Sequence, residues 1–385
     1  MAKKKFSVVI PYKGRLRNLR VALTALSEQT LDRAEFEVVV GSLDAEEGFH
    51  RAVREFGECL DLTAVTRNAP WNFSQARNLG LRHVTGEIVV LLDADMALPP
   101  DGLESLYRRY FAAAADVCVL GQLVGMDGLA DTPQETEDLP EHRNFRQILT
   151  ELGRTPGAKR DPRWHFEDVV LPWTMVWTGF VALPAAVVHE HDLLFDENFT
   201  GWGAEDQEWG YRVARAGLPI VRGEDVFALH LPHVRNVSHN MRTFDVNKGY
   251  FLTRWPTLDV QLYRAFDSWS ANRWYEQTVR EVAVAVAGDG ETLGVARGQV
   301  SGTDTVVAGL VLDAQGRIAL PLQRTLFDAD TPVQILPLVG FTMPFPDRSV
   351  AECRILPALL RLGEQLREAV LGEAERVAGR VVTPV

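Results

Sequence analysis

The sequence predicts an α/β fold, in which helices flank a mixed, mostly parallel sheet, followed by a small α+β unit near the C-terminus. Two observations support this prediction. Between residues 6 and 122, short runs of Val, Ile and Leu alternate with helical patterns, and strands joined by helices run parallel with right-handed crossovers. After residue 290, Gly and Asp interrupt shorter apolar segments, which is typical of a separate unit with short strands.

The N-terminal elements come in strand–helix pairs. The first strand, at 6–10, is rich in β-branched residues, and the helix after it carries leucine on one face at intervals of three or four residues. Pro100 opens the last helix, because proline is tolerated in a first helical turn. Strands and helices are expected in alternation at 6–10, 16–29, 35–41, 45–58, 61–66, 73–84, 87–93, 100–110 and 115–122.

The middle of the chain loses this pattern. Residues 123–168 are polar and contain proline, so we expect a long loop with short helices that acts as a lid or an acceptor loop. Residues 169–188 carry no charge and are long enough to cross a bilayer. However, Pro172, Gly179 and Pro184 would break a membrane helix, which favours a buried strand followed by a helix that begins at Pro184.

The rest of the chain is expected to form regular structure in shorter pieces. These are ordered segments at 176–183 and 226–230, a helix near 204–216, helices over 243–286, strands at 305–312, 317–322 and 332–339, and a long helix from about 349 to 376. The last helix has an apolar stripe, which indicates a core contact or a homodimer contact, at Ile355, Leu359, Leu362 and Leu366.

These patterns divide the chain into three expected parts. Residues 1–240 form the α/β domain, and residues 241–289 form a helical extension rich in aromatic side chains. Residues 290–385 form an accessory α+β unit of unknown role. The third part offers a surface for a homodimer, but no recognisable motif.

The composition describes an acidic globular protein. Of 385 residues, 46% are hydrophobic, and 52 acidic against 40 basic side chains give a formal charge of −12. Nucleic-acid-binding surfaces need a positive field, so a general nucleic-acid partner is excluded. Cys59, Cys118 and Cys353 form no CxxC pair, which predicts reduced thiols. The first apolar run is too short for a signal peptide, so we expect a cytoplasmic protein without an integral membrane span.

A pair of acids directly follows the strand at 87–93. Ligands bind beyond the carboxyl ends of strands in an open α/β sheet, and Asp93 and Asp95, separated by Ala94, can approach one divalent ion there. Carboxylate oxygens suit Mg²⁺ or Mn²⁺, and phosphates can complete the coordination. A solvated acidic turn is the alternative, but the position after a buried strand favours a site.

Three further groups of residues carry chemistry. Arg77 and Asn78 lie on a helix whose start can meet a phosphate, although a surface helix is the simpler interpretation. Two glycines flank Trp202 just before the acids that open the next helix, which permits a tight turn beside a ligand. His230 and His233 follow a strand and are candidate metal ligands or structural histidines.

Taken together, these segments resemble the family 2 glycosyltransferases of the GT-A fold. The resemblance covers about residues 5–240 and is closest to bacterial chondroitin-polymerase-type domains and to a galactosyltransferase-like C-terminal motif. The segments that carry it are IPYKGRLRNL, FSQARNLGL, EIVVLLDADM, GWGAEDQEWGYR and ALHLPH, in that order. It implies a GT-A fold, with a Rossmann-like, mostly parallel sheet, and a DXD motif at Asp93–Asp95.

The resemblance also implies roles for individual residues. Asp206 is the expected catalytic base, and Trp202, Gly203 and Glu205 shape the acceptor site. Asp95 is the expected metal ligand together with His230, for which His233 is the rival. The expected donor-binding residues are Pro11, Tyr12, Arg15, Ser42, Asp44, Arg77, Asn78, Asp93, Ala94 and Asp95.

One departure from the family concerns the nucleotide base. The family usually has an acidic pair after the second strand, where it reads uracil, whereas this chain has Gly41, Ser42, Leu43 and Asp44. Ser42 or Asp44 takes over that contact, or the donor base is not uracil.

The expected reaction follows from this chemistry. A divalent ion stabilises the charge on a diphosphate leaving group, and one carboxylate that is ionised at neutral pH deprotonates the attacking hydroxyl. The resemblance therefore predicts an inverting, Mn²⁺- or Mg²⁺-dependent hexosyl- or N-acetylhexosaminyltransferase. Its expected partners are a nucleotide-sugar donor, with UDP as the first candidate, and a glycan or small-molecule acceptor. A sugar-phosphate nucleotidyltransferase and a non-catalytic sugar-nucleotide- or glycan-binding module stay open as alternatives.

Overall fold

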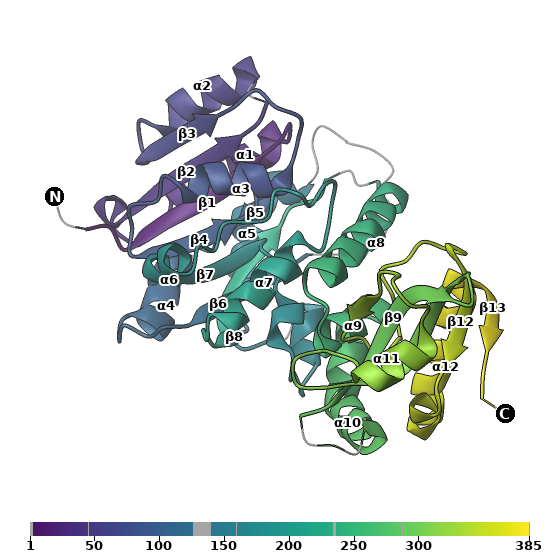
Figure 1. Ribbon diagram of the computed structural model, residues 1–385. Coiled ribbons are helices and arrows are strands. Elements are labelled where there is room, and N and C mark those ends of the chain that lie inside the picture. The colour runs from purple at the N-terminus through teal and green to yellow at the C-terminus, as the bar shows by residue number, and fades with distance from the viewer. Residues whose placement is uncertain are drawn as a thin grey trace. The chain divides into compact units, whose positions relative to one another are not determined.

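The computed structural model describes residues 3–44, 46–125, 140–158, 160–233, 236–286, 288 and 290–384. The chain forms two compact units (Figure 1). The first contains residues 1–167 and 172–247, and the second contains residues 168–171 and 248–385. Each unit has a sheet of its own, so each is described by itself.

The first unit is built on a mixed sheet. In the described part of the chain its strand order is β3-β2-β1-β4-β7-β6-β8-β5. The strands are β1 (Phe6–Tyr12), β2 (Phe36–Ser42), β3 (Leu62–Thr66), β4 (Ile88–Leu92), β5 (Met96–Ala97), β6 (Cys118–Val124), β7 (Phe180–Pro184) and β8 (Ile220–His230). The strands β3, β2, β1 and β4 are parallel, whereas β7 runs antiparallel to both β4 and β6. The α/β architecture expected from the sequence is confirmed.

Helices complete the first unit. Its α-helices are α1 (Leu16–Ser27), α2 (Glu47–Phe56), α3 (Phe73–Leu81), α4 (Gly102–Leu106), α5 (Pro140–Gly153), α6 (Ala185–Glu190) and α7 (Glu205–Arg215), and α8 (Val237–Arg254) begins in this unit. Shorter turns are the 3-10 helices Arg33–Glu35, Pro162–His165 and Pro172–Met175 and the π-helix Tyr107–Phe111. The uncharged stretch forms β7 followed by α6, as the sequence predicted. No described helix is long and apolar enough to cross a membrane.

The central strands explain why their sequences are continuously apolar. Every residue of β1, β2 and β4 is buried, because α3 packs against β1 and β2 while other helices cover the remaining surface. Gly41 of β2 allows this close packing. A Cβ atom at this position would lie 2.1 Å from the carbonyl oxygen of Ala76 in α3.

Strand pairing brings distant polar residues to one edge of the sheet. Strand β5 pairs antiparallel with β8, so that Met96 lies opposite His230. The backbone N–H of Leu231 also donates to the carbonyl of Asp95 at 2.8 Å. The acids after β4 and the histidines after β8 therefore become neighbours through backbone hydrogen bonds alone.

The second unit contains helices and a smaller sheet. Its helices are α9 (Leu258–Ala265), α10 (Ser268–Val286), α11 (Leu320–Leu326) and α12 (Glu364–Val377), with a 3-10 helix at Pro357–Arg361. Its strands are β9 (Thr292–Val300), β10 (Thr303–Leu312), β11 (Gln334–Leu336), β12 (Val350–Ile355) and β13 (Ala378–Val382). In the described residues the sheet order is β11-β9-β10-β12-β13.

Several expected elements in the less regular regions were wrong. The loop expected at 123–168 contains the long helix α5, while residues 126–139 lie outside the described part. The strand expected at 317–322 is instead largely helix α11. The helix expected at 349–376 begins as β12, because Pro357 and Gly363 interrupt helical structure before α12 starts.

We predict that Gly41→Ala prevents stable folding of the first unit. The new methyl group would collide with backbone rather than with a flexible side chain, so we expect a loss of about 3 kcal/mol or more in the free energy of unfolding. Gly153→Ala, at the end of α5, is the matched control because a Cβ there meets nothing within 4 Å. Thermal unfolding followed by circular dichroism measures both; equal melting temperatures would contradict the packing argument.

Candidate active site

Charged side chains from five segments of the first unit converge beyond the carboxyl end of β4. They come from the loop after β1, from α3, from the loop after β4, from the start of α7 and from the end of β8. The residues are Arg15, Arg77, Asp93, Asp95, Glu205, Asp206, His230 and His233. The sheet edge expected from the sequence therefore holds a continuous polar cluster.

Asp95 lies between a guanidinium group and two imidazoles. Its Oδ2 atom is 2.6 Å from Nη1 of Arg15, 3.3 Å from Nδ1 of His233 and 3.9 Å from Nε2 of His230. One ligand atom from each of Asp95, His230 and His233 lies within 4.8 Å of the others. Two ligand atoms about 2.1 Å from one ion are about 3 to 4 Å apart, depending on their angle. These three side chains therefore fit a single divalent ion after small adjustments.

Arg77 holds the other three carboxylates together. Its guanidinium lies 3.3 Å from Asp93, 3.2 Å from Glu205 and 3.0 Å from Asp206. Its side chain is only 3% exposed. These contacts indicate that Arg77 positions the three acids around it. The sequence had suggested that it contacts the donor.

Thr178 also holds the carboxylate of Asp206. The hydroxyl of Thr178 donates to Oδ1 of Asp206 at 2.7 Å, and its backbone N–H donates to Oδ2 at 3.0 Å. Together with Arg77, these donors leave the Asp206 carboxylate little rotational freedom. Sequence reasoning missed Thr178, because it lies in an uncharged stretch where a hydroxyl gives no signal.

Two acids of the cluster resist ionisation. Burial raises the pKa of Glu205 to about 7, and the charge of Asp206 adds to this effect while Arg77 opposes it. Burial likewise raises the pKa of Asp93 to about 6, against the attraction of Arg77 and with the repulsion of Asp95 and Asp206. The Oε2 atom of Glu205 is buried and has no hydrogen-bond partner among the described residues. This atom is therefore able to hold a proton or to accept a bond from a ligand.

The expected base-binding residues lie on two adjacent strands. The register of β1 and β2 places Pro11 opposite Gly41 and Tyr12 opposite Ser42. The hydroxyl of Tyr12 donates to Glu46 at 3.1 Å, and the hydroxyl of Ser42 bonds the backbone of Asp44. Pro11, Tyr12 and Ser42 are buried, whereas Asp44 is exposed. Ala94, between Asp93 and Asp95 in the sequence, is buried.

The turn before α7 has an unusual backbone. Gly201, Gly203 and Ala204 all have positive φ values, of 74°, 96° and 66°, a conformation that glycine adopts without strain. A Cβ on Gly203 would also come 2.6 Å from the ring of Phe244. The Trp202 ring packs beside Phe244 with ring centroids 5.7 Å apart and is partly exposed. The turn thus presents Trp202 and Gly203 next to Glu205 and Asp206.

Asn78 faces away from this cluster toward the loop before the turn. Its amide nitrogen donates to the carbonyl of Phe195 and to the carboxylate of Glu197, both at 2.9 Å. Its amide oxygen accepts from the N–H of Phe195 at 2.8 Å. The side chain is 1% exposed. Glu197 was not anticipated from the sequence, because nothing in its neighbourhood marks it.

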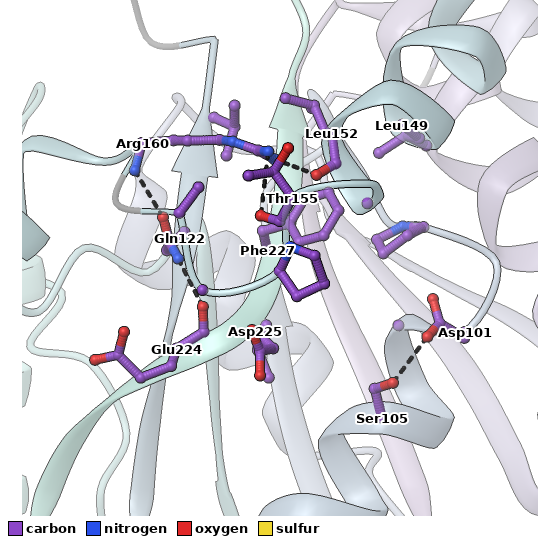
Figure 2. A pocket seen from close by; sticks show the side chains of 18 of the residues that line it. Asp101, Ser105, Gln122, Leu149, Leu152, Thr155, Arg160, Glu224, Asp225 and Phe227 are labelled. Atoms are coloured by element: carbon purple, nitrogen blue, oxygen red, sulfur yellow. Dashed lines mark hydrogen bonds between the residues drawn. The ribbon is translucent and has the colours of Figure 1, made fainter.

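A separate cavity of about 250 Å³ lies elsewhere in the first unit (Figure 2). Arg160 donates to the carbonyls of Leu152 and Thr155, and Gln122 bonds both the backbone N–H of Arg160 and the carbonyl of Glu224. Arg109 pairs with Asp225 at 2.8 Å. None of the cluster residues lines this cavity, so it is not the site described above.

Comparison with known proteins identifies the N-terminal part of the chain. Residues 7–164 match the family model "Glycosyl transferase family 2". Validoxylamine A glucosyltransferase of Streptomyces hygroscopicus subsp. jinggangensis is 27% identical over 98% of this chain and 96% of its own length. Chondroitin synthase of Escherichia coli is 28% identical, over 58% of this chain and 34% of the relative.

Among solved structures, the chain is similar to a fragment of S. aureus TarS and to a mannosyltransferase from Pyrobaculum calidifontis. The 1–349 fragment of S. aureus TarS is 17% identical, with a TM-score of 0.49 over 73% of this chain and 74% of that one. The mannosyltransferase PcManGT from Pyrobaculum calidifontis, in complex with GDP-Man and Mn²⁺, is 20% identical, with a TM-score of 0.48 over 75% and 77% of the two chains.

We predict that Glu205→Gln gains stability relative to the parent as the pH rises. Since the folded-state pKa of Glu205 is raised from 4.5 to about 7, its contribution to stability is complete below about pH 4.5 and is lost as the pH passes 7. Glutamine does not ionise, so Glu205→Gln does not lose stability in this way. Between pH 5 and 8, the unfolding free energy of the variant minus that of the parent should therefore increase by roughly 1–3 kcal/mol.

Urea unfolding at several pH values measures this difference. Glu58→Gln, at an exposed position of the same unit, corrects for the change of side chain. A difference that stays constant with pH, or that moves in favour of the parent, would contradict the raised pKa.

Proposed function

We propose that this chain, whose residues 7–164 match the family 2 glycosyltransferase model, transfers a sugar from a nucleotide-sugar donor, with inversion, onto a hydroxyl of a small-molecule acceptor in a reaction that needs a divalent ion. The observation that carries the proposal is the convergence of Asp95, His230 and His233 beside the Asp206 carboxylate held by Arg77 and Thr178. Asp95 and the two histidines are suited to binding a cation beside a diphosphate. Asp206, held by Arg77 and Thr178, is suited to acting as a general base.

The choice of a small acceptor rests on how far the relatives match. The validoxylamine A glucosyltransferases align with 98% of this chain, so the similarity includes the second unit. The chondroitin and hyaluronan synthases match 58% of this chain or less. The full-length similarity favours transfer of glucose to a small molecule over extension of a polysaccharide.

The donor set at Asp95 suits Mn²⁺ or Mg²⁺. Between these two ions, the imidazole nitrogens of His230 and His233 favour Mn²⁺, since Mg²⁺ is bound mainly by oxygen ligands. When bound, the ion supplies Lewis-acid stabilisation of the negative charge on the diphosphate leaving group. Arg15, paired with Asp95 at 2.6 Å, adds a second positive charge at the same place. Of the expected donor-binding residues at the ends of β1 and β2, Asp44 is exposed and is the proposed contact with the nucleotide base, whereas Pro11, Tyr12 and Ser42 are buried.

Asp206 is the proposed catalytic base. Its oxygens are fixed by Arg77 and Thr178, and its side chain is 20% exposed, so that an acceptor hydroxyl can reach it. A carboxylate in this position accepts the hydroxyl proton as the oxygen attacks the anomeric carbon. With Asp206 acting only as the base, a single attack by the acceptor oxygen in line with the leaving group inverts the anomeric centre. Trp202 offers a flat apolar face for the acceptor.

The proposal is tested by incubating the full chain with Mn²⁺, UDP-glucose or GDP-glucose, and validoxylamine A. The expected result is release of nucleoside diphosphate together with a glucosylated product detected by mass spectrometry. Release of pyrophosphate from a nucleoside triphosphate and glucose 1-phosphate would instead identify a nucleotidyltransferase. Binding of the donor without turnover of any acceptor would favour a binding module.

We predict that Asp206→Asn lowers the transfer rate by about 10²–10⁴-fold, the usual contribution of a general base. Donor affinity should stay within about threefold, because the asparagine oxygen can still accept the bond from the Thr178 hydroxyl, while only the bond from the Thr178 backbone N–H is lost. Thr178→Val, which removes only the orienting hydroxyl, should cause a smaller loss. Steady-state kinetics and calorimetric titration of the donor separate the two effects, and full activity of Asp206→Asn would rule out the assigned base.

We predict that Asp95→Asn weakens Mn²⁺ binding by at least about tenfold, since it removes the charged ligand of the proposed site. Electron paramagnetic resonance of free Mn²⁺ measures binding without any need for activity. His230→Ala and His233→Ala, compared side by side, show which imidazole binds the ion more strongly. Asp116→Asn, at an exposed position, is the control, and equal affinities of all four variants and the parent would refute a metal site here.

A further inference from the structure

The side of helix α3 that faces away from Asp93 holds the loop at 195–199. Asn72 caps α3 by accepting from the N–H of Gln75 at 2.9 Å, and its amide nitrogen donates to the carbonyls of Glu197 and Phe199 at 3.0 and 2.9 Å. Asn78, almost two turns later, binds Phe195 through both its amide oxygen and its amide nitrogen. The loop is therefore fastened to α3 at both of its ends.

The hydrogen bonds of Asn78 leave no donor for a nucleotide. A primary amide has two N–H groups, and these are directed at the carbonyl of Phe195 and the carboxylate of Glu197. The side chain is 1% exposed, and its oxygen already accepts from the N–H of Phe195. Asn78 therefore lacks both the free N–H groups and the exposure that contact with a base or a diphosphate would require.

The loop at 195–199 leads directly into the proposed acceptor site. It continues through the positive-φ turn that carries Trp202 and ends at the first residues of α7. From the other side, Asn247 donates to the carbonyls of Thr200 and Gly203 at 3.0 and 2.8 Å. The turn is thus held between side chains of α3 and of α8.

We propose that Asn78 is a positioning residue for the acceptor half of the site. It acts through the 195–199 loop on the placement of Trp202 and the Glu205–Asp206 pair, without touching either substrate. The proposal rests on the proposed function for the location of the acceptor. It differs from the role suggested by the sequence, in which Asn78 lies beside the donor.

The first test uses Asn78→Asp in the full chain. The substitution keeps the size and the acceptor oxygen of the side chain, but it turns a second oxygen toward the carbonyl of Phe195 and the carboxylate of Glu197, where a donor is needed. We expect hydrogen–deuterium exchange in residues 195–204 to accelerate by about tenfold or more, because the loop loses its anchor. This measurement does not depend on catalysis.

The second measurement separates the donor from the acceptor. Calorimetric titration with UDP or GDP in the presence of Mn²⁺ should give affinities within about twofold of the parent. The KM for validoxylamine A should rise, or kcat for transfer should fall, by about fivefold or more, while the slow hydrolysis of the donor by water continues. This split is the signature of a defect confined to the acceptor side.

A double variant provides the rescue. In Asn78→Asp with Glu197→Gln, the new amide at 197 can donate to the new carboxylate at 78, which restores one contact with its polarity reversed. Exchange in the loop should return at least half-way to that of the parent, and acceptor KM should follow it. Asn144→Asp, on the exposed face of α5, makes the same chemical change elsewhere and should alter nothing.

Glu197→Ala keeps the proposal testable if Asn78→Asp does not fold. Glu197 is only partly buried, and its removal takes away one of the three bonds of Asn78, so a smaller change of the same kind is expected. Weaker nucleotide binding with unchanged loop exchange would overturn the proposal and make Asn78 a donor ligand. Unchanged exchange and unchanged kinetics would also overturn it. If the parent itself binds no nucleotide, the proposed function fails, while the exchange data still decide whether Asn78 holds the loop.

Discussion

The candidate active site depends on the burial of one guanidinium group. Arg77 lies within 3.3 Å of Asp93, Glu205 and Asp206, which come from β4 and α7 and are far apart in the sequence. Two like charges about 4 Å apart repel by about 4 kcal/mol at an effective dielectric constant of 20, so neighbouring acids are stabilised by a shared counter-ion. Removing one member of such a buried network typically costs about 3–5 kcal/mol. Arg77 therefore serves both the packing of α3 and the geometry of the acids.

Even with Arg77 in place, the cluster carries an excess of negative charge. Four carboxylates, at Asp93, Asp95, Glu205 and Asp206, face two guanidinium groups, at Arg15 and Arg77. Formally, two negative charges remain when all four acids are ionised. The raised pKa values of Asp93 and Glu205 reflect this excess together with burial. A divalent cation has the charge that would balance it, which is a physical reason to expect one here independent of any motif.

The sequence predicted those parts of the fold and site that depend on local pattern. The alternation of apolar runs and helices over 6–122 located the parallel strands, and the position of Asp93 and Asp95 directly after β4 placed them at a sheet edge. What the sequence could not predict depends on pairing between distant segments. Strand β8 brings His230 beside Asp95 only through its pairing with β5, and Thr178 meets Asp206 only through tertiary packing. In the second unit, β12 was mistaken for helix, because its residues share an apolar spacing with the helix that follows Pro357.

The adjacency of Arg77 and Asn78 explains how one helix can serve both halves of the site. Successive residues on an α-helix point about 100° apart, so Arg77 reaches the carboxylates while Asn78 reaches the loop at Phe195. Neither contact could be maintained if α3 moved freely on the sheet. Gly80 allows α3 to lie close to β1, because a Cβ at position 80 would come 2.5 Å from a methyl carbon of Val9. Gly41 likewise allows β2 to lie close to α3. Because interiors packed at this density deform little, Asp93 and the loop at 195–199 keep a fixed distance through the body of α3. A glycine in β2 and one in α3 are thus as necessary to the proposed chemistry as the charged residues that they help to place.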